Sequence, residues 1–148
     1  MSTPYDSYTR DGSVVATAIQ TLLKGAAGGL GVQDVWYGEQ TNIPRFPALT
    51  VDPAPVKSTL NGVPMMLRND FTVYVYVYLA KIGDLQATRL ACEQLAEAVR
   101  DVIHTDKTLG GNIIQGWVTE IEPGFARKSG ALLVADRITF EGMDKRGV

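Results

Sequence analysis

His104 and Cys92 are the side chains best suited to proton transfer and nucleophilic attack, and each is the single residue of its type. Histidine titrates near neutral pH, and a cysteine thiolate is both a nucleophile and a metal ligand. His104 follows the last apolar turn of a predicted helix, where an imidazolium would favour the negative end of the helix dipole. Cys92 lies on the apolar side of that helix, as an inert core thiol does. We therefore expect a helix cap and a core thiol, and no closed zinc site.

Carboxylates are more numerous, but they form no catalytic or calcium-binding motif. Glu120 and Glu122 share one face of a predicted strand, which is typical of a solvated strand edge. Asp136 differs, because it interrupts an apolar row in the last predicted strand. A buried carboxylate needs a partner, and Arg137 points to the opposite face. We expect Asp136 to be locally exposed; the alternative is a salt bridge to another element or another subunit.

Phe125, Arg127 and Lys128 lie at the tip of the last predicted hairpin. They form either a solvated turn or a docking loop, in which the basic pair would meet an acidic partner surface and Phe125 would anchor the contact. No group of residues in the chain has the spacing of a catalytic or cofactor-binding motif. We therefore expect no enzyme, no cofactor and no metal site.

The hydrophobic periodicity predicts two helices that must position these residues. The first has Asp11 or Ser13 as its N-cap and ends at the glycines of the segment 28–31, GGLG. This segment follows a helix and lacks a subsequent Lys-Ser/Thr pair, so it is not typical of a phosphate loop. The second helix runs from Leu85 to about Ile103 after a Gly83-Asp84 cap. Its apolar stripe comprises Leu85, Thr88, Cys92, Leu95, Val99 and Val102.

The remaining segments predict strands. Two short ones, at 32–37 and 47–51, are bounded by prolines. A turn-rich segment ends in Leu60-Asn61-Gly62-Val63-Pro64, which indicates a hairpin tip or a flexible arm. A long strand opens near Met66, and a final hairpin comprises strands at 113–121 and 131–141 joined by a loop at 122–130. We expect one α+β domain over residues 1–148, with a mostly antiparallel sheet and both helices on one face.

The long strand contains FTVYVYVYL, residues 71–79. Alternate residues of a strand share a face, so valines line one face and Tyr74, Tyr76 and Tyr78 line the other. Two helices side by side cover roughly four strands on one face, and the small valines let them approach closely. The tyrosines then form an aromatic surface near the ~300–600 Å² of the largest apolar patch on a typical monomer.

Three kinds of cover could protect the tyrosines. The irregular passage from Gly38 to Gly62 could fold across them, a ligand could bind there, or a second copy of the chain could pack on them. We expect the second copy, because a tyrosine ring packs well at an interface while its hydroxyl stays hydrated or bonded.

Bulk composition excludes several classes of protein. The chain has 148 residues, 45% of them apolar and 20% charged, with a net charge of −2, so it has no general attraction to nucleic acid or anionic membranes. It lacks a long apolar run and a signal-peptide pattern. With a single cysteine, we expect a protein made in a reducing cytoplasm.

The element order resembles that of siphophage tail-terminator proteins over most of the chain. The closest local likeness is Leu109-Gly110-Gly111, followed by VTEIEPGFAR at 118–127 and by Gly130-Ala131-Leu132-Leu133 before a strand. The resemblance implies a hexameric ring that caps the tail tube, stops its growth and offers a surface to the head-connector proteins. DNA would pass through the lumen without being read.

Such a ring uses a heterologous interface, in which two different patches meet. The tyrosine face and an edge such as the segment 53–64 are candidates for these patches. The resemblance implies a location in the tail neck of the virion after assembly in the host cytoplasm. The alternatives are a head-completion or neck adaptor of the same virion, and a small-ligand-binding domain with the tyrosines as its pocket floor.

Overall fold

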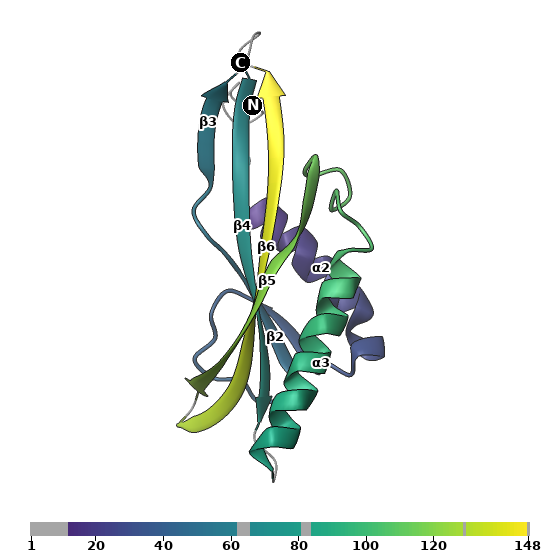
Figure 1. Cartoon of the computed structure of the whole chain (residues 1–148), viewed down its shortest axis with the longest axis vertical. Helices are drawn as coiled ribbons and strands as arrows, with labels where there is room; N and C mark the ends of the chain where they lie inside the picture. Colours follow the sequence, from purple (N-terminus) through teal and green to yellow (C-terminus); the bar gives the residue numbers. More distant parts are fainter. Residues whose placement is uncertain (1–11, 62–65, 81–83, 129, 148) are drawn as a thin grey trace.

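The structure is a computed structural model that describes residues 12–61, 66–80, 84–128 and 130–147. These residues form two helices and six strands (Figure 1). In chain order the elements are α2 (Gly12–Leu30), β1 (Asp34–Tyr37), β2 (Ala48–Pro53), β3 (Lys57–Asn61), β4 (Met66–Ala80), α3 (Leu85–Ile103), β5 (Gln115–Lys128) and β6 (Ala131–Gly147).

All six strands belong to one sheet with the order β1-β2-β4-β6-β5, and β3 pairs with the first part of β4. β1 and β2 are parallel, and every other pairing is antiparallel. The predicted α+β class with a mostly antiparallel sheet is therefore confirmed. β4 pairs along its whole length with residues 133–147 of β6, and these two strands form the centre of the sheet.

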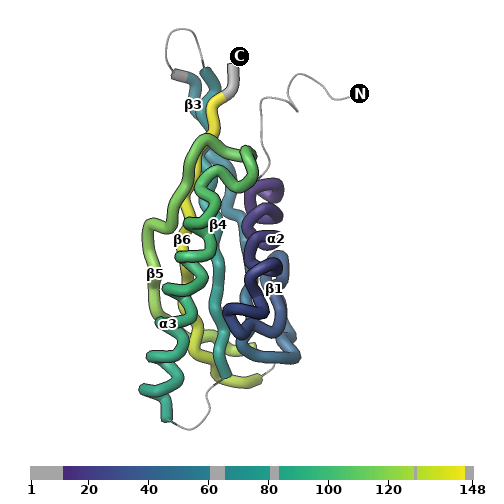
Figure 2. The backbone as a smooth tube through the Cα atoms, turned by 90° about the vertical axis from the view of Figure 1, so that its right-hand side faces the viewer, coloured from purple at the N-terminus to yellow at the C-terminus, as the bar shows by residue number. Residues whose placement is uncertain are grey.

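Both helices cover the same face of the sheet (Figure 2). The valines of β4 lie on this helix face, where Val73, Val75 and Val77 are fully buried, as the alternation predicts. α2 contributes Val15, Ile19 and Leu23 to this core. α3 contributes Cys92, Ala96, Val99 and Ile103. Burial of apolar side chains between the two helices and one sheet face is therefore the main source of stability.

The helix ends differ in how closely they match the sequence prediction. α3 has the predicted bounds, and the Asp84 carboxylate accepts a hydrogen bond from the Gln86 amide at 3.0 Å. In α2, Ser13 lies inside the helix and the proposed cap Asp11 lies outside the described residues. Gly28 and Gly29 do not stop the helix, contrary to the prediction. They are exposed and helical, and the chain turns at Gly31, where φ is +74°.

The last two strands are longer than predicted, and a third strand was missed. β5 continues to Lys128, so the predicted loop at 122–130 is mostly strand. β5 is the last strand in the sheet order, so it is an edge strand. An edge strand tolerates Pro123, because proline lacks only the amide donor that a central strand would need for pairing on both sides. β3 lies within the predicted turn-rich segment and forms a hairpin with β4, whose tip at 62–65 lies outside the described residues.

One end of the sheet extends beyond both helices (Figure 1). We call this end the arm; it consists of β3 and the paired parts of the two central strands, residues 66–70 and 143–147. The arm is continuous with the rest of the sheet, because β4 and β6 run through it without a break.

Candidate interaction surface

The face of the sheet opposite the helices carries the tyrosines and is called the tyrosine face. The strand registers place four residues side by side in each row across it. One row is Ala48, Tyr78, Ala135 and Gly124; the next is Thr50, Tyr76, Arg137 and Glu122; the third is Asp52, Tyr74, Thr139 and Glu120. The tyrosines of β4 therefore have β2, with Thr50 and Asp52, on one side. On the other side they have β6, with Arg137, and beyond it the carboxylates of β5.

The Tyr78 end of this face is covered by the same chain. Tyr78 is only 4% exposed, and it packs in a second apolar cluster with Ile43 and Leu133. Ile43 comes from the connection between β1 and β2, which belongs to the irregular passage considered as a covering loop. Burial raises the pKa of the Tyr78 phenol above its ordinary value of 10.0. At this end no second copy is required to protect the ring.

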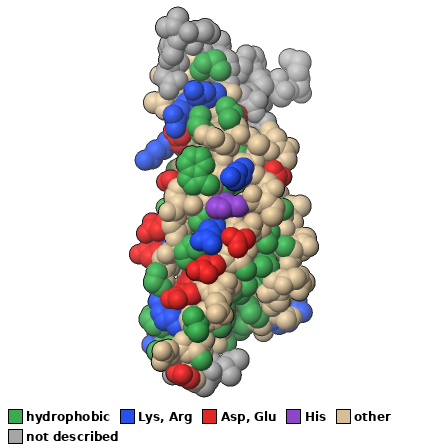
Figure 3. Space-filling view, turned by 45° about the vertical axis from the view of Figure 1, so that its right-hand side comes forward, with side chains coloured by type: hydrophobic (Ala, Val, Ile, Leu, Met, Phe, Trp, Pro, Cys, Tyr) green, Lys and Arg blue, Asp and Glu red, His purple; other side chains and the backbone are tan. Residues whose placement is uncertain are grey.

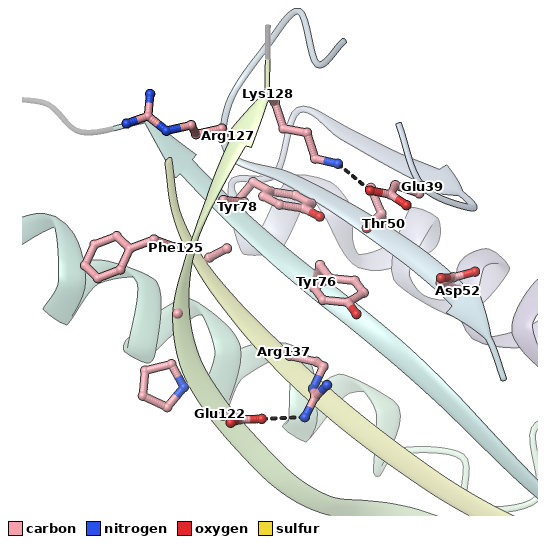
Figure 4. A pocket seen from close by; sticks show the side chains of 14 residues that line it. Glu39, Thr50, Asp52, Tyr76, Tyr78, Glu122, Phe125, Arg127, Lys128 and Arg137 are labelled. Carbon is pink, nitrogen blue, oxygen red and sulfur yellow. Dashed lines mark hydrogen bonds and ion pairs between the residues drawn. The ribbon is translucent and has the colours of Figure 1, made fainter. Parts of the chain in front are cut away.

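The rest of the ladder is open. Tyr74 and Tyr76 are half-buried. The rings of Tyr76 and Tyr78 stack with centroids 6.1 Å apart, and those of Tyr74 and Tyr76 are tilted at 6.5 Å. A groove of about 510 Å³ lies over Tyr76 and Tyr78, between β2 and β5 (Figure 4). Its lining includes Thr50, Asp52, Tyr76, Tyr78, Glu122 and Arg137.

Two cations on the tyrosine face are each paired with a carboxylate (Figure 4). The Lys128 ammonium lies 3.1 Å from a Glu39 carboxylate oxygen and 5.7 Å from the centroid of the Tyr78 ring. Arg137 forms an ion pair with Glu122, and its Cζ lies 5.1 Å from the centroid of the Tyr74 ring. Each cation thus has an anionic partner and an aromatic partner. These contacts restrict the conformations of the two side chains that line the groove.

The predicted docking residues do not all lie together. Lys128 lies on the tyrosine face, but strand alternation places Phe125 and Arg127 on the other face of β5. Figure 4 shows both of these side chains directed away from Tyr76. The guanidinium carbon of Arg89 lies 4.9 Å from the centroid of the Phe125 ring, which is 54% exposed. The six predicted interface residues therefore divide by side-chain direction. Tyr74, Tyr76, Tyr78 and Lys128 face the tyrosine side, whereas Phe125 and Arg127 line the groove on β5 but direct their side chains to the other face.

Sequence reasoning missed most of the polar lining of the groove. Arg137 and Glu122 could be found once the register is known, because they continue the row of Tyr76. Glu39 comes from the irregular connection after β1, and no periodicity indicates its contact with Lys128.

Asp136 is fully buried on the helix face, so the expectation of local exposure is wrong. It lies opposite Val77 in the sheet, under α3, and neither carboxylate oxygen accepts a hydrogen bond from the described residues. Burial raises its pKa, and the charge of Arg89 opposes this shift. The neighbouring Cys92 thiol is also buried, and burial with the nearby Asp136 charge raises its pKa to about 12. The predicted place of this thiol in the core is confirmed.

His104 is the C-cap residue of α3, as predicted, but its imidazole is not used as a cation. Its Nε2 accepts a hydrogen bond from the Val118 amide at 2.9 Å, which requires an unprotonated nitrogen. Burial lowers the pKa of His104, and Lys107 and Arg100 lower it further. The side chain therefore links the end of α3 to β5 in its neutral form.

Within the described part of the chain, no three His, Cys, Asp or Glu side chains come together as metal ligands. Neither described helix is long and apolar enough to span a membrane. Comparison with known proteins adds no family, since no protein-family model and no curated protein matches the sequence.

Proposed function

We propose that the chain is a non-enzymatic virion assembly protein, a tail terminator that forms a ring of about six copies. The ring would cap the tail tube, stop its polymerisation and offer a surface to the head-connector proteins. The number of copies, the two partners and the location in the virion come from analogy with the family that the sequence resembles.

The open half of the tyrosine face is the observation that supports this proposal most directly. Tyr74 and Tyr76 are half-buried, and the neighbouring Trp117 is 48% exposed, although aromatic side chains gain most from full burial. The fixed cations and ordered rings around them form a shaped surface of the kind found in protein interfaces. Packing of another copy on this surface would complete the burial that the chain itself provides only at Tyr78.

The Tyr76→Glu variant tests this assignment. A carboxylate at the centre of the groove should prevent self-association and capping of tail tubes, because it would be desolvated without a partner. The fold should survive, since the side chain lies outside the helix-covered core. Sedimentation and tube-length measurements with purified tail-tube protein would report both effects.

Leu90→Glu is the matched control for that test. Leu90 is an exposed apolar residue of α3, 56% accessible, and it lies on the other side of the molecule from the tyrosine face. The same change of charge there should leave association and capping intact. Equal behaviour of the two variants would contradict the placement of the interface on the tyrosine face.

Two other functions make different predictions in the same experiments. A neck adaptor of the same virion would self-associate but would leave tube length unchanged. A small-ligand-binding domain would use the 510 Å³ groove as its site and would stay monomeric when purified. The groove gives that second alternative its support.

A further inference from the structure

The arm carries an excess of positive charge on the side that continues the tyrosine face. The registers place Lys57 beside Asp70 in one row, and Arg68 beside Lys145 in the next. Arg68 bonds to Asp70 at 3.0 Å. Lys57 and Lys145 are exposed, and neither forms an ion pair within the described residues. In Figure 3, Lys and Arg side chains gather near this end of the molecule.

The juxtaposition of Arg68 and Lys145 is unfavourable in an isolated chain. Like charges directly opposite each other in an antiparallel pair are destabilising, and only Arg68 has a carboxylate partner among the described residues. An anionic surface placed against the arm would remove this penalty. The positive charge of the arm therefore favours contact with an acidic partner surface.

The groove region has the opposite charge. Three cationic residues line it. Lys128 and Arg137 are already paired with carboxylates, and the Arg127 side chain is directed to the other face of β5. Asp52 and Glu120 lie at the two ends of the row that contains Tyr74, and Glu141 follows in the next row toward the arm. None of these three carboxylates forms an ion pair within the described part of the chain. The open aromatic surface is thus flanked by uncompensated negative charge.

The arm cannot reach the groove of its own chain. β4 passes through the arm at 66–70 and then forms the floor of the groove at Tyr76 and Tyr78, and β6 pairs with it throughout. A continuous paired strand cannot fold back over its own face. The complementary charges can therefore meet only between two copies, and the two surfaces are different, as a heterologous contact requires.

We propose that the arm of one copy packs against the groove of the next copy, with Lys57 and Lys145 facing Asp52 and Glu120. This contact deepens the proposed ring and rests on it. The partner that binds the groove is a second copy of this chain. Each chain carries both the positive arm and the negative groove region, and these two surfaces cannot touch within one molecule.

Charge reversal on each surface gives the sharpest test. The arm variant is Lys57→Glu with Lys145→Glu, and the groove variant is Asp52→Lys with Glu120→Lys. Each alone places like charges in contact and should weaken self-association at least about tenfold, as expected from the loss of several exposed charge pairs. Glu93→Lys with Glu97→Lys on the exposed side of α3 is the matched control, which should associate like the unmodified chain.

Mixing the two variants separates this arrangement from other contacts. In an equal mixture, each reversed arm meets a reversed groove and each native arm meets a native groove, so association should return in alternating assemblies. A chain with all four changes should also associate. Circular dichroism of each variant would verify folding, and association of the unmodified chain should weaken between about 0.1 M and about 1 M salt.

The outcomes distinguish the contact from the proposed function. If the unmodified chain associates and caps tubes but the mixture stays dissociated, or if single variants associate normally, the arm–groove contact is wrong and the terminator proposal stands. If the predicted charge pattern holds but tubes are not capped, the contact stands and the terminator proposal fails. An unmodified chain that remains monomeric and caps no tubes would overturn both.

Discussion

The two faces of the sheet are built from the same strands, yet they are completed in different ways. On the helix face, Val73, Val75 and Val77 are fully buried beneath two helices. On the tyrosine face, only the Tyr78 end is sealed by the connection between β1 and β2. Tyr76 lines an open groove, and Tyr74 is half-buried beyond it. Alternation along one strand therefore specifies the chemistry of each face, but it does not specify what covers it.

This contrast separates two physical roles within a single strand. Residues of the helix face stabilise the fold, because their burial is intramolecular and complete. Residues of the open half of the tyrosine face are only half-buried within the chain, so part of their surface is available for association. Substitutions matched across the two faces test this distinction.

The largest effect is expected from Val75→Asp, beside Tyr76 in the sequence but on the helix face. An unpaired carboxylate at a fully buried position should cost about 4 kcal/mol or more of unfolding free energy. Urea denaturation would measure the loss. A variant that unfolds no more easily than Tyr76→Glu would remove the distinction between the faces.

A smaller difference in stability is expected between alanine substitutions at two glycines of β5. A Cβ at Gly116 would lie 2.3 Å from the Cζ atom of Phe140 on the helix face, so Gly116→Ala should destabilise the fold by about 1–3 kcal/mol. At Gly124, on the tyrosine face, the nearest atom to such a Cβ is the Ala135 carbonyl oxygen at 3.4 Å. Gly124→Ala should stay within about 0.5 kcal/mol of the unmodified chain, and thermal unfolding of both would show whether the order reverses.

The smallest effect concerns Asp136, the polar residue buried in the helix face. Because burial raises its pKa, the folded state holds this proton more tightly than the unfolded state does, and its contribution to stability falls as pH rises above the ordinary carboxyl value of 3.8. Asp136→Asn removes that penalty and should raise the melting temperature by a few degrees at neutral pH. The difference between the two proteins should shrink on acidification; a difference independent of pH would show that the carboxylate is not the cause.

Much of the helix face could be predicted from the sequence, because helix and strand periodicities are local signals. The bounds of α3, its Asp84 cap and the valine face all follow from spacing and capping chemistry. The length of β5 could not be predicted in this way. The sequence Glu122-Pro123-Gly124 is typical of a turn, and this segment becomes strand only through its pairing with β6. Asp136 was also misjudged, because a single polar residue in an apolar row does not reveal that α3 covers it.

The tyrosine face was less predictable for a related reason. The ladder is visible in the alternation, but its cover at Tyr78 depends on Ile43, which lies in a connection without periodicity. The opposite directions of Phe125 and Arg127 compared with Lys128 follow from strand alternation only once that segment is known to be strand. Long-range pairing therefore decides which predicted interface residues share a surface.

The unbroken course of β4 and β6 through arm and groove has a geometric consequence. Strands in a sheet twist by a roughly fixed amount along their length, so the arm and the groove of one molecule are held at a set angle. If each arm occupies the next molecule's groove, that angle becomes the rotation from copy to copy. The twist of a single sheet would then decide whether the assembly closes, and after how many subunits.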